Sequence, residues 1–167
     1  MKKNLALIGM MGCGKSTVAK ELAKLMPEFN LVDIDLEIEK SADKKISEIF
    51  LRYGEQHFRM LESQKITEYL SGINQILSLG GGAFENPQNR ERILKNSKVV
   101  YLKATPETIY ERIKSEYHRP LLKNISIERI KEILLKRETN YLKSHIIITT
   151  DNKTPNQIAH EIIEVFI

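Results

Sequence analysis

The chain has 167 residues, 41% hydrophobic and 29% charged, and this length and balance suit one domain over residues 1–167. The net charge of +4 could indicate a nucleic-acid partner, but basic and acidic residues are interleaved without a run of five or six, which favours anionic small molecules. One cysteine excludes an internal disulfide and fits a reducing cytoplasm, and no stretch approaches transmembrane length.

The first predicted element is a strand at residues 5–8, whose unbroken apolar run is typical of burial on both faces. Residues 9–16, GMMGCGKS, match the phosphate-loop pattern G-x-x-x-x-G-K-[ST] at every required position. Glycines let backbone N–H groups wrap a phosphate, Lys15 adds a mobile positive charge, and the Ser16 hydroxyl suits Mg²⁺. We predict a nucleotide phosphate site here; the alternative is a glycine-rich turn that matches the pattern by chance.

Helices and strands alternate along the rest of the chain. Asn86, Thr105 and Thr154 each precede a proline, the cap signature of a helix start. A second buried strand is predicted at residues 31–34, and further strands at residues 76–79, 99–102 and 146–148. Helices are predicted at residues 15–26, 36–53 with a break near 41–43, 55–70, 87–95, 106–114, 126–143 and from 155 onward. This order indicates an α/β fold, a three-layer α/β/α arrangement with a five-stranded parallel sheet covered on both faces. Ligands of such sheets gather at the carboxyl ends of the strands.

Two carboxylates, Asp33 and Asp35, stand at the end of the second strand. On an extended segment, residues two apart point to the same side. One carboxylate could then help to hold Mg²⁺ beside Ser16 while the other faces an acceptor hydroxyl. An equally good interpretation is that both merely cap a turn.

Three consecutive glycines, residues 80–82, follow the third strand. A turn rarely needs three glycines, whereas close approach of a ligand to the backbone does. A flexible hinge is the alternative.

Two arginines occupy positions that packing alone does not explain. Arg137 lies on the apolar stripe of its predicted helix, and a guanidinium on an inward face needs an anion as a partner. Arg59 precedes Glu62 by three residues, so that Glu62 could orient it. Each arginine alone is more often structural, but together with the glycine turn the two could clamp a planar carboxylate. The stripe consists of Ile127, Ile130, Leu134, Arg137 and Tyr141.

These motifs together resemble one family. The phosphate loop, Asp33-x-Asp35, Phe58-Arg59-x-x-Glu62, Gly80-Gly81-Gly82 and Arg119-Pro-Leu-Leu122 occur in the order and spacing of shikimate kinases, over essentially the whole chain. The resemblance implies a fold like that of the P-loop nucleoside monophosphate kinases. It implies transfer of the γ-phosphoryl group of ATP to the 3-hydroxyl of shikimate, in aromatic amino-acid biosynthesis. The expected partners are shikimate and ATP, with no nucleic acid and no membrane, and the expected enzyme is a cytoplasmic monomer.

The resemblance also implies roles for residues on the acceptor side. A substrate-binding region would span about residues 33–62, and a lid about residues 113–124. Asp35 would hold and polarise the acceptor hydroxyl, while Arg59 and Arg137 would bind the shikimate carboxylate. The ring would be cradled by Gly80, Gly81 and Gly82.

On the nucleotide side, the resemblance implies that Ser16 and Asp33 serve Mg²⁺, the latter through water. Lys15 and Arg119 would oppose charge on the transferring group, and with Asp35 they form the implied catalytic set. The nucleotide would be bound by Gly12, Cys13, Gly14, Lys15, Ser16, Thr17, Arg112, Arg119, Lys153 and Pro155.

Two positions depart from the family pattern. Cys13 stands where relatives more usually carry alanine, serine or threonine; a helix N-terminus and Lys15 nearby favour a reactive thiolate, whereas a thiol pointing under the loop would be inert. The family often has a proline between Arg137 and Tyr141, which this chain lacks, so the end of that helix stays open.

Two other functions remain open. A different small-molecule or nucleoside monophosphate kinase would need a base-reading pocket or a second phosphate clamp. A non-enzymatic nucleotide sensor would have no use for an acceptor-facing carboxylate and three clamping arginines together.

Overall fold

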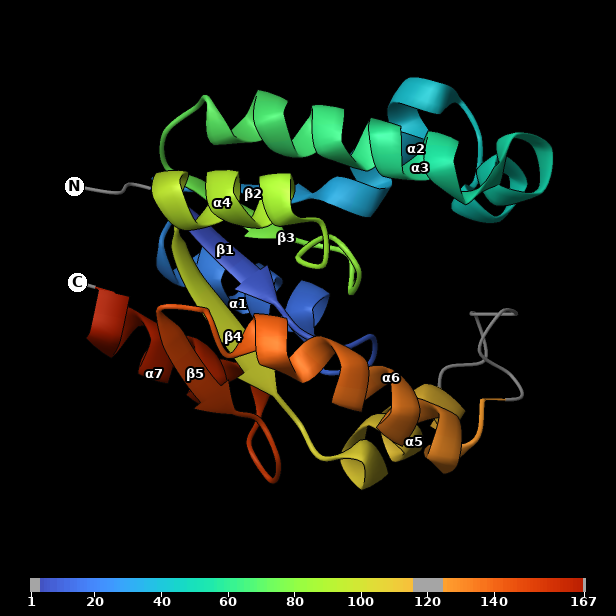
Figure 1. Cartoon of the computed structure of the whole chain (residues 1–167). Coiled ribbons are helices and arrows are strands. Elements are labelled where there is room, and N and C mark those ends of the chain that lie inside the picture. Colours follow the sequence, from blue (N-terminus) through green and yellow to red (C-terminus); the bar gives the residue numbers. More distant parts are fainter. Residues whose placement is uncertain (1–3, 116–124, 167) are drawn as a thin grey trace.

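A computed structural model describes residues 4–115 and 125–166, and it confirms the predicted α/β class. Five parallel strands form one sheet in the order β2-β3-β1-β4-β5 (Figure 1). The strands are β1 (Leu5–Ile8), β2 (Asn30–Asp33), β3 (Gln75–Ser78), β4 (Lys98–Lys103) and β5 (Ile146–Thr149). All four residues of β1 are buried, as its apolar run predicts.

Helices cover both faces of this sheet and complete the three layers. The described residues form α1 (Lys15–Leu25), α2 (Ile34–Ala42), α3 (Ile46–Leu70), α4 (Pro87–Asn96), α5 (Pro106–Ser115), α6 (Ile127–Tyr141) and α7 (Pro155–Phe166). Helices α1 and α7 contact each other on one face, and α3 and α4 contact each other on the opposite face (Figure 1). No helix within residues 4–115 and 125–166 combines the length and the apolar character needed to cross a membrane.

The three cap-and-proline signatures are confirmed by hydrogen bonds. In each, the side-chain oxygen of the cap residue accepts from the backbone N–H three residues later, which satisfies a donor at the helix start. These distances are 3.0 Å for Asn86, 3.3 Å for Thr105 and 3.2 Å for Thr154.

Two predictions about the second strand are wrong. Strand β2 lies at the edge of the sheet and pairs only with β3, so Leu31 is 40% exposed rather than buried. Asp35 does not lie on an extended segment, because α2 begins at Ile34 and places Asp35 in its first turn. Asp33 caps this helix, accepting a hydrogen bond from Leu36 N at 3.3 Å.

The region between β2 and β3 is built from α2 and a bent α3. Helix α2 ends near the predicted break, with Asp43 in the left-handed conformation at φ 49°. Helical segments lie on either side of Gly54, as predicted, and Gly54, with φ 82° and ψ 173°, interrupts the helical backbone between them within α3. The carboxyl ends of β1, β2 and β3 lead into the phosphate loop, Asp33 and the glycine turn, so they bring these segments to one edge of the sheet.

Candidate active site

The phosphate loop joins β1 to α1 and turns on glycines with positive φ. Gly12 has φ 76° and Gly14 has φ 99°, conformations that side-chain-bearing residues rarely adopt. The Lys15 ammonium folds back over the loop and donates to the carbonyl oxygens of Gly9 at 2.8 Å and Met10 at 3.0 Å. The loop therefore holds its positive charge directly above the backbone that would wrap a phosphate.

Oxygen atoms from three elements meet beside this loop. The Ser16 hydroxyl donates to Asp33 Oδ2 at 3.0 Å and lies 3.5 Å from the Ser78 hydroxyl at the end of β3. In the part of the chain that is described, no cluster of three or more His, Cys, Asp or Glu side chains could hold a metal by itself. A hydroxyl and one carboxylate fit Mg²⁺, which commonly takes its other ligands from water and substrate phosphates.

A pocket of about 360 Å³ lies over the loop and connects it to the acceptor-side residues. Asp33, Asp35, Gly80 and Gly81 line it together with residues 11–18. At its other end it is lined by the predicted nucleotide residues Arg112, Lys153 and Pro155.

The three glycines after β3 are each pressed against a charged side chain. A β-carbon on Gly80 would lie 3.1 Å from Glu62 Oε1 and 3.2 Å from Asp35 Oδ1. On Gly81 it would lie 3.0 Å from Arg137 Nη1, and on Gly82 2.7 Å from Arg59 Nη2. None of the three has a positive φ, so close approach, not backbone freedom, requires glycine here. The turn thus collects the two predicted clamp arginines and the acceptor-facing carboxylate.

Arg59 reaches the glycine turn from α3 with two carboxylates beside it. Its Nη1 donates to Glu62 Oε2 at 2.9 Å, and its Nη2 meets the exposed Glu55 at 3.4 Å. Burial raises the pKa of Glu62, Asp35 nearby adds to the rise, and the charges of Arg59 and Arg137 oppose it. The guanidinium groups of Arg59 and Arg137 and the carboxylates of Glu62 and Asp35 therefore form one charged cluster beside the turn.

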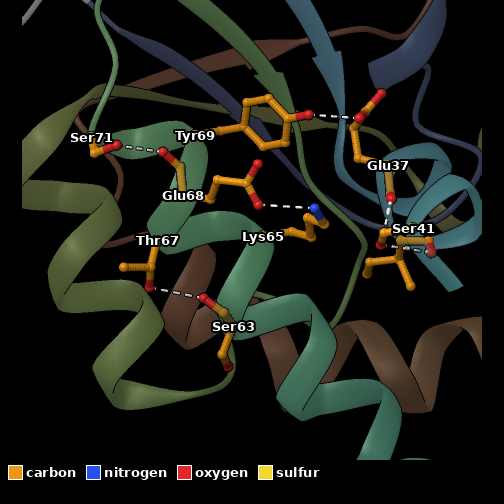
Figure 2. Close-up of polar contacts among 9 residues, drawn as sticks. Glu37, Ser41, Ser63, Lys65, Thr67, Glu68, Tyr69 and Ser71 are labelled. Carbon is orange, nitrogen blue, oxygen red and sulfur yellow. Dashed lines mark hydrogen bonds and ion pairs between the residues drawn. The ribbon is translucent and has the colours of Figure 1, made fainter.

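The helices that carry the acceptor-side residues are joined at a second point. The Tyr69 hydroxyl of α3 donates to Glu37 Oε2 of α2 at 2.6 Å (Figure 2). This bond raises the pKa of Tyr69 to about 12. The pKa of Glu37 is lowered first by its hydrogen bond from Lys40 and then by the one from Tyr69. Asp35 lies two residues before Glu37 in the first turn of α2. The bond from Tyr69 therefore helps to fix Asp35 relative to α3.

Arg112 of α5 ties the phosphate loop to the segment after β5. Its Nη1 donates to the Cys13 carbonyl oxygen at 3.0 Å and to Thr150 Oγ1 at 3.2 Å. Lys153, predicted to bind the nucleotide, lines the pocket while its ammonium lies 2.8 Å from Glu161 Oε2. The predicted nucleotide end is therefore built from α5, the β5–α7 segment and the loop.

Three expectations remain: the state of the Cys13 thiol, the end of helix α6, and the lid with Arg119. The Cys13 thiol is buried under the loop, since a β-carbon on Gly9 would lie 2.8 Å from its Sγ, and this geometry favours the inert alternative. Helix α6 continues through residues 138–140 and ends at Tyr141. Arg119 and most of the predicted lid, residues 116–124, lie outside the described residues.

Sequence reasoning overlooked two polar residues at this site. Ser78 is paired in register with Asp33 across β2 and β3, and it is the last residue of the strand that leads toward the glycines. The sequence predicts for Glu62 only that it could orient Arg59. In the structure Glu62 is 1% exposed and also faces Asp35 and Gly80. The signal for Ser78 is a serine between two leucines at the end of a strand. The burial of Glu62 depends on distant elements, so the local sequence does not indicate it.

Comparisons of the sequence and of the structure with known proteins point to the same family. The sequence matches the shikimate kinase family over residues 11–166. A shikimate kinase from Persephonella marina is 43% identical over 161 residues, which are 96% of this chain and 97% of that relative. One from Thermodesulfovibrio yellowstonii is 40% identical over 163 residues, 97% of this chain and 94% of the relative. The solved structure of an Acinetobacter baumannii shikimate kinase in complex with shikimate superposes with a TM-score of 0.91 at 32% identity, covering 98% of this chain and 92% of the other.

Proposed function

The chain belongs to the shikimate kinase family of ATP-dependent phosphotransferases, and from this premise we propose how its residues divide the transfer of the ATP γ-phosphoryl group to the 3-hydroxyl of shikimate. One observation carries the proposal. Gly80, Gly81 and Gly82 are packed against Asp35, Arg137 and Arg59 at the edge of a pocket that the phosphate loop lines. A carboxylate-bearing acceptor is the ligand that two guanidinium groups beside one turn would bind.

The phosphate loop and Lys15 hold the phosphates of ATP. Backbone N–H groups of residues 12–17 surround the inner phosphates, and the start of α1 adds the positive end of its dipole. Lys15, which now donates to Gly9 and Met10, turns its ammonium outward to the β- and γ-phosphates. In a largely dissociative transfer, positive charge at these oxygens is the main contribution the protein can make.

Ser16 and Asp33 would hold Mg²⁺, with Asp33 acting through water. When bound, the ion supplies positive charge that neutralises the phosphate oxygens. The 3.0 Å hydrogen bond between Ser16 Oγ and Asp33 Oδ2 supports this assignment, because it brings two hard oxygen donors to the loop.

The acceptor is held at its carboxylate and at its reacting hydroxyl. Arg59 is fixed by Glu62 and presents its other edge to the carboxylate of shikimate, which displaces the exposed Glu55. Arg137 binds the same carboxylate from α6, and the ring lies over residues 80–82. This two-point attachment turns the 3-hydroxyl toward the γ-phosphate.

In the transfer step, the 3-hydroxyl oxygen forms a bond to the γ-phosphorus while the bond from that phosphorus to the β,γ-bridging oxygen breaks. The products are shikimate 3-phosphate and ADP. Asp35 orients the hydroxyl and accepts its proton as the bond forms; a loose transition state asks for little early deprotonation, so orientation is its larger contribution.

The remaining assignments rest on the family resemblance. Residues 113–124 act as a lid that excludes water, and Arg119 within them reaches the transferring group. Arg112, Lys153 and Pro155 contact the adenine end of ATP, which their position along the pocket supports.

We further propose that the enzyme works as a monomer in the cytoplasm. The proposal rests on the family resemblance and on the single cysteine, which can form no internal disulfide and fits a reducing compartment. Size-exclusion chromatography with light scattering tests the monomer; a stable dimer at assay concentration contradicts it.

A coupled assay of ADP release tests the proposed acceptor. We expect shikimate to stimulate ATP consumption strongly, and a panel of nucleoside monophosphates and sugar acids to give no comparable turnover. Equal turnover with a nucleoside monophosphate would favour the rival kinase, and nucleotide binding without any stimulated turnover would favour the sensor.

A further inference from the structure

Tyr141, the last residue of α6, is a fully buried side chain that touches the glycine turn. It is 0% exposed, and its hydroxyl donates to the carbonyl oxygen of Gly81 at 2.5 Å. Gly81 is the middle glycine of the three that separate β3 from the loop before α4. The hydrogen bond therefore holds the centre of the turn from its buried side.

Gly81 is also the point where the acceptor side meets the phosphate loop. A β-carbon there would lie 3.0 Å from Arg137 Nη1, 3.5 Å from Met11 N and 3.6 Å from Gly9 O. Arg137 precedes Tyr141 by one helical turn, so both side chains leave the same face of α6 and reach the same glycine. A displacement of Gly81 would change its fit to Arg137 and to the loop together.

A second tyrosine next to Tyr141 separates ring packing from hydroxyl bonding. The rings of Tyr101, on β4, and Tyr141 lie 5.0 Å apart between centroids at an interplanar angle of 34°. Tyr101 is 1% exposed, and within the described residues its buried hydroxyl has no hydrogen-bond partner. The two rings make the packing contact, and neither hydroxyl takes part in it. Of the two hydroxyls, the one on Tyr141 reaches the turn.

The hydroxyl of Tyr141 keeps its proton at neutral pH. Burial raises its pKa well above the ordinary tyrosine value, and Arg137 nearby only partly offsets the rise. The group is therefore a permanent donor to the Gly81 carbonyl.

We propose that Tyr141 is a positioning residue for the acceptor: through its bond to the Gly81 carbonyl it sets the place of the glycine turn against Arg137 and the phosphate loop. This inference rests on the proposed function, in which Arg137 and the turn bind shikimate. It assigns Tyr141 an effect on acceptor binding that a residue serving only the core would lack.

The experiment compares Tyr141→Phe with Tyr101→Phe, two substitutions that each remove one hydroxyl from the same stacked pair. For Tyr141→Phe, the loss of one buried hydrogen bond should raise the KM for shikimate by about three- to tenfold. The KM for ATP and kcat should change less than about twofold, because the phosphate loop keeps its own contacts with Lys15 and Arg112 when the turn shifts. Tyr101→Phe should leave all three values within about twofold of the wild type.

Stability is followed in the same variants by thermal unfolding with and without shikimate. If Tyr141→Phe is too unstable for kinetics, the shikimate-induced rise in its melting temperature reports the affinity instead, and this rise should be smaller than in the wild type. An unchanged shikimate KM, an equal rise in the KM for ATP, or the same effect in Tyr101→Phe would overturn the inference. A wild-type enzyme that ignores shikimate would instead overturn the proposed function.

Discussion

Arg59 and Glu62 form an ion pair in which one partner is buried and the other is not: Arg59 Nη1 lies 2.9 Å from Glu62 Oε2, with side-chain exposures of 33% and 1%. The buried carboxylate fixes one edge of the guanidinium. The other edge meets Glu55 in a longer contact with an exposed side chain. This pair therefore presents a preoriented fork to an incoming carboxylate.

Arg59→Lys should weaken shikimate binding about ten- to hundredfold and leave ATP binding nearly unchanged. Lysine keeps the charge but replaces a planar fork by a point contact, and a lost charge-assisted hydrogen bond costs about 1.5–3 kcal/mol. Isothermal titration calorimetry measures both affinities. The matched control is Arg52→Lys on the same helix, an exposed arginine paired with Glu48. Unchanged shikimate affinity in Arg59→Lys would make Arg59 a structural residue.

Asp35→Asn and Asp33→Asn should have different defects, although both carboxylates line one pocket. Asp35→Asn should lower kcat with ATP affinity nearly intact, because we propose that Asp35 orients the acceptor. Asp33→Asn should raise the Mg²⁺ concentration needed for half-maximal activity, because Asp33 accepts a hydrogen bond from Ser16 beside the phosphate loop. Steady-state kinetics at varied Mg²⁺ separates the two. Identical defects would mean that the division of roles is wrong.

Ionisation of Glu62 should make the native state less stable as the pH rises. Burial places the pKa of Glu62 in the folded protein above its ordinary value of 4.5. The folded state then binds the proton more tightly than the unfolded state, so the contribution is fully present below about pH 4.5 and is lost as the pH rises through the raised pKa. Relative to Glu62→Gln, the free energy of unfolding of the wild type should fall as the pH rises above about 4.5 and through the raised pKa of Glu62.

Urea unfolding of the two proteins across this range makes the comparison. Because each pH compares two proteins that share every other titrating group, the difference isolates position 62. A difference that stays flat, or that grows in favour of the wild type with pH, would show that Glu62 is not held by burial as described.

Cys13 should resist alkylation in the folded protein. Its side chain is 0% exposed and points under the loop toward Gly9. Since it is the chain's single cysteine, intact-mass measurement after maleimide treatment gives an unambiguous count. We expect almost no labelling of native protein with or without Mg-ATP, and one label after denaturation. Rapid labelling of native protein that Mg-ATP slows would contradict the buried placement.

Local patterns predicted most of the elements, because their causes are local. The apolar run of β1, the phosphate-loop spacing and the cap-and-proline pairs each depend on a few neighbouring residues. The interior glycines of the loop could likewise be predicted, since their positive φ values follow from the turn itself.

The errors concern properties that depend on distant segments. Exposure of Leu31 follows from the place of β2 at the sheet edge, which strand order decides and local sequence does not. The placement of Asp35 is an exception with a local cause. Capping of a turn is the alternative interpretation of the two carboxylates, and the hydrogen bond from Leu36 N shows that Asp33 caps a helix. Likewise, composition predicts the glycine turn, but the four charged side chains packed against it come from α2, α3 and α6.

The measurement that tests the account most directly is a cycle of kcat/KM values with two acceptors and two enzymes. The acceptors are shikimate and its methyl ester, which lacks the negative carboxylate, and the enzymes are the wild type and Arg137→Gln. If Arg137 binds the carboxylate, the ester should lower kcat/KM of the wild type by about a hundredfold, but that of Arg137→Gln by only about tenfold or less. The same penalty for the ester in both enzymes would contradict the account, because the carboxylate would then not interact with Arg137.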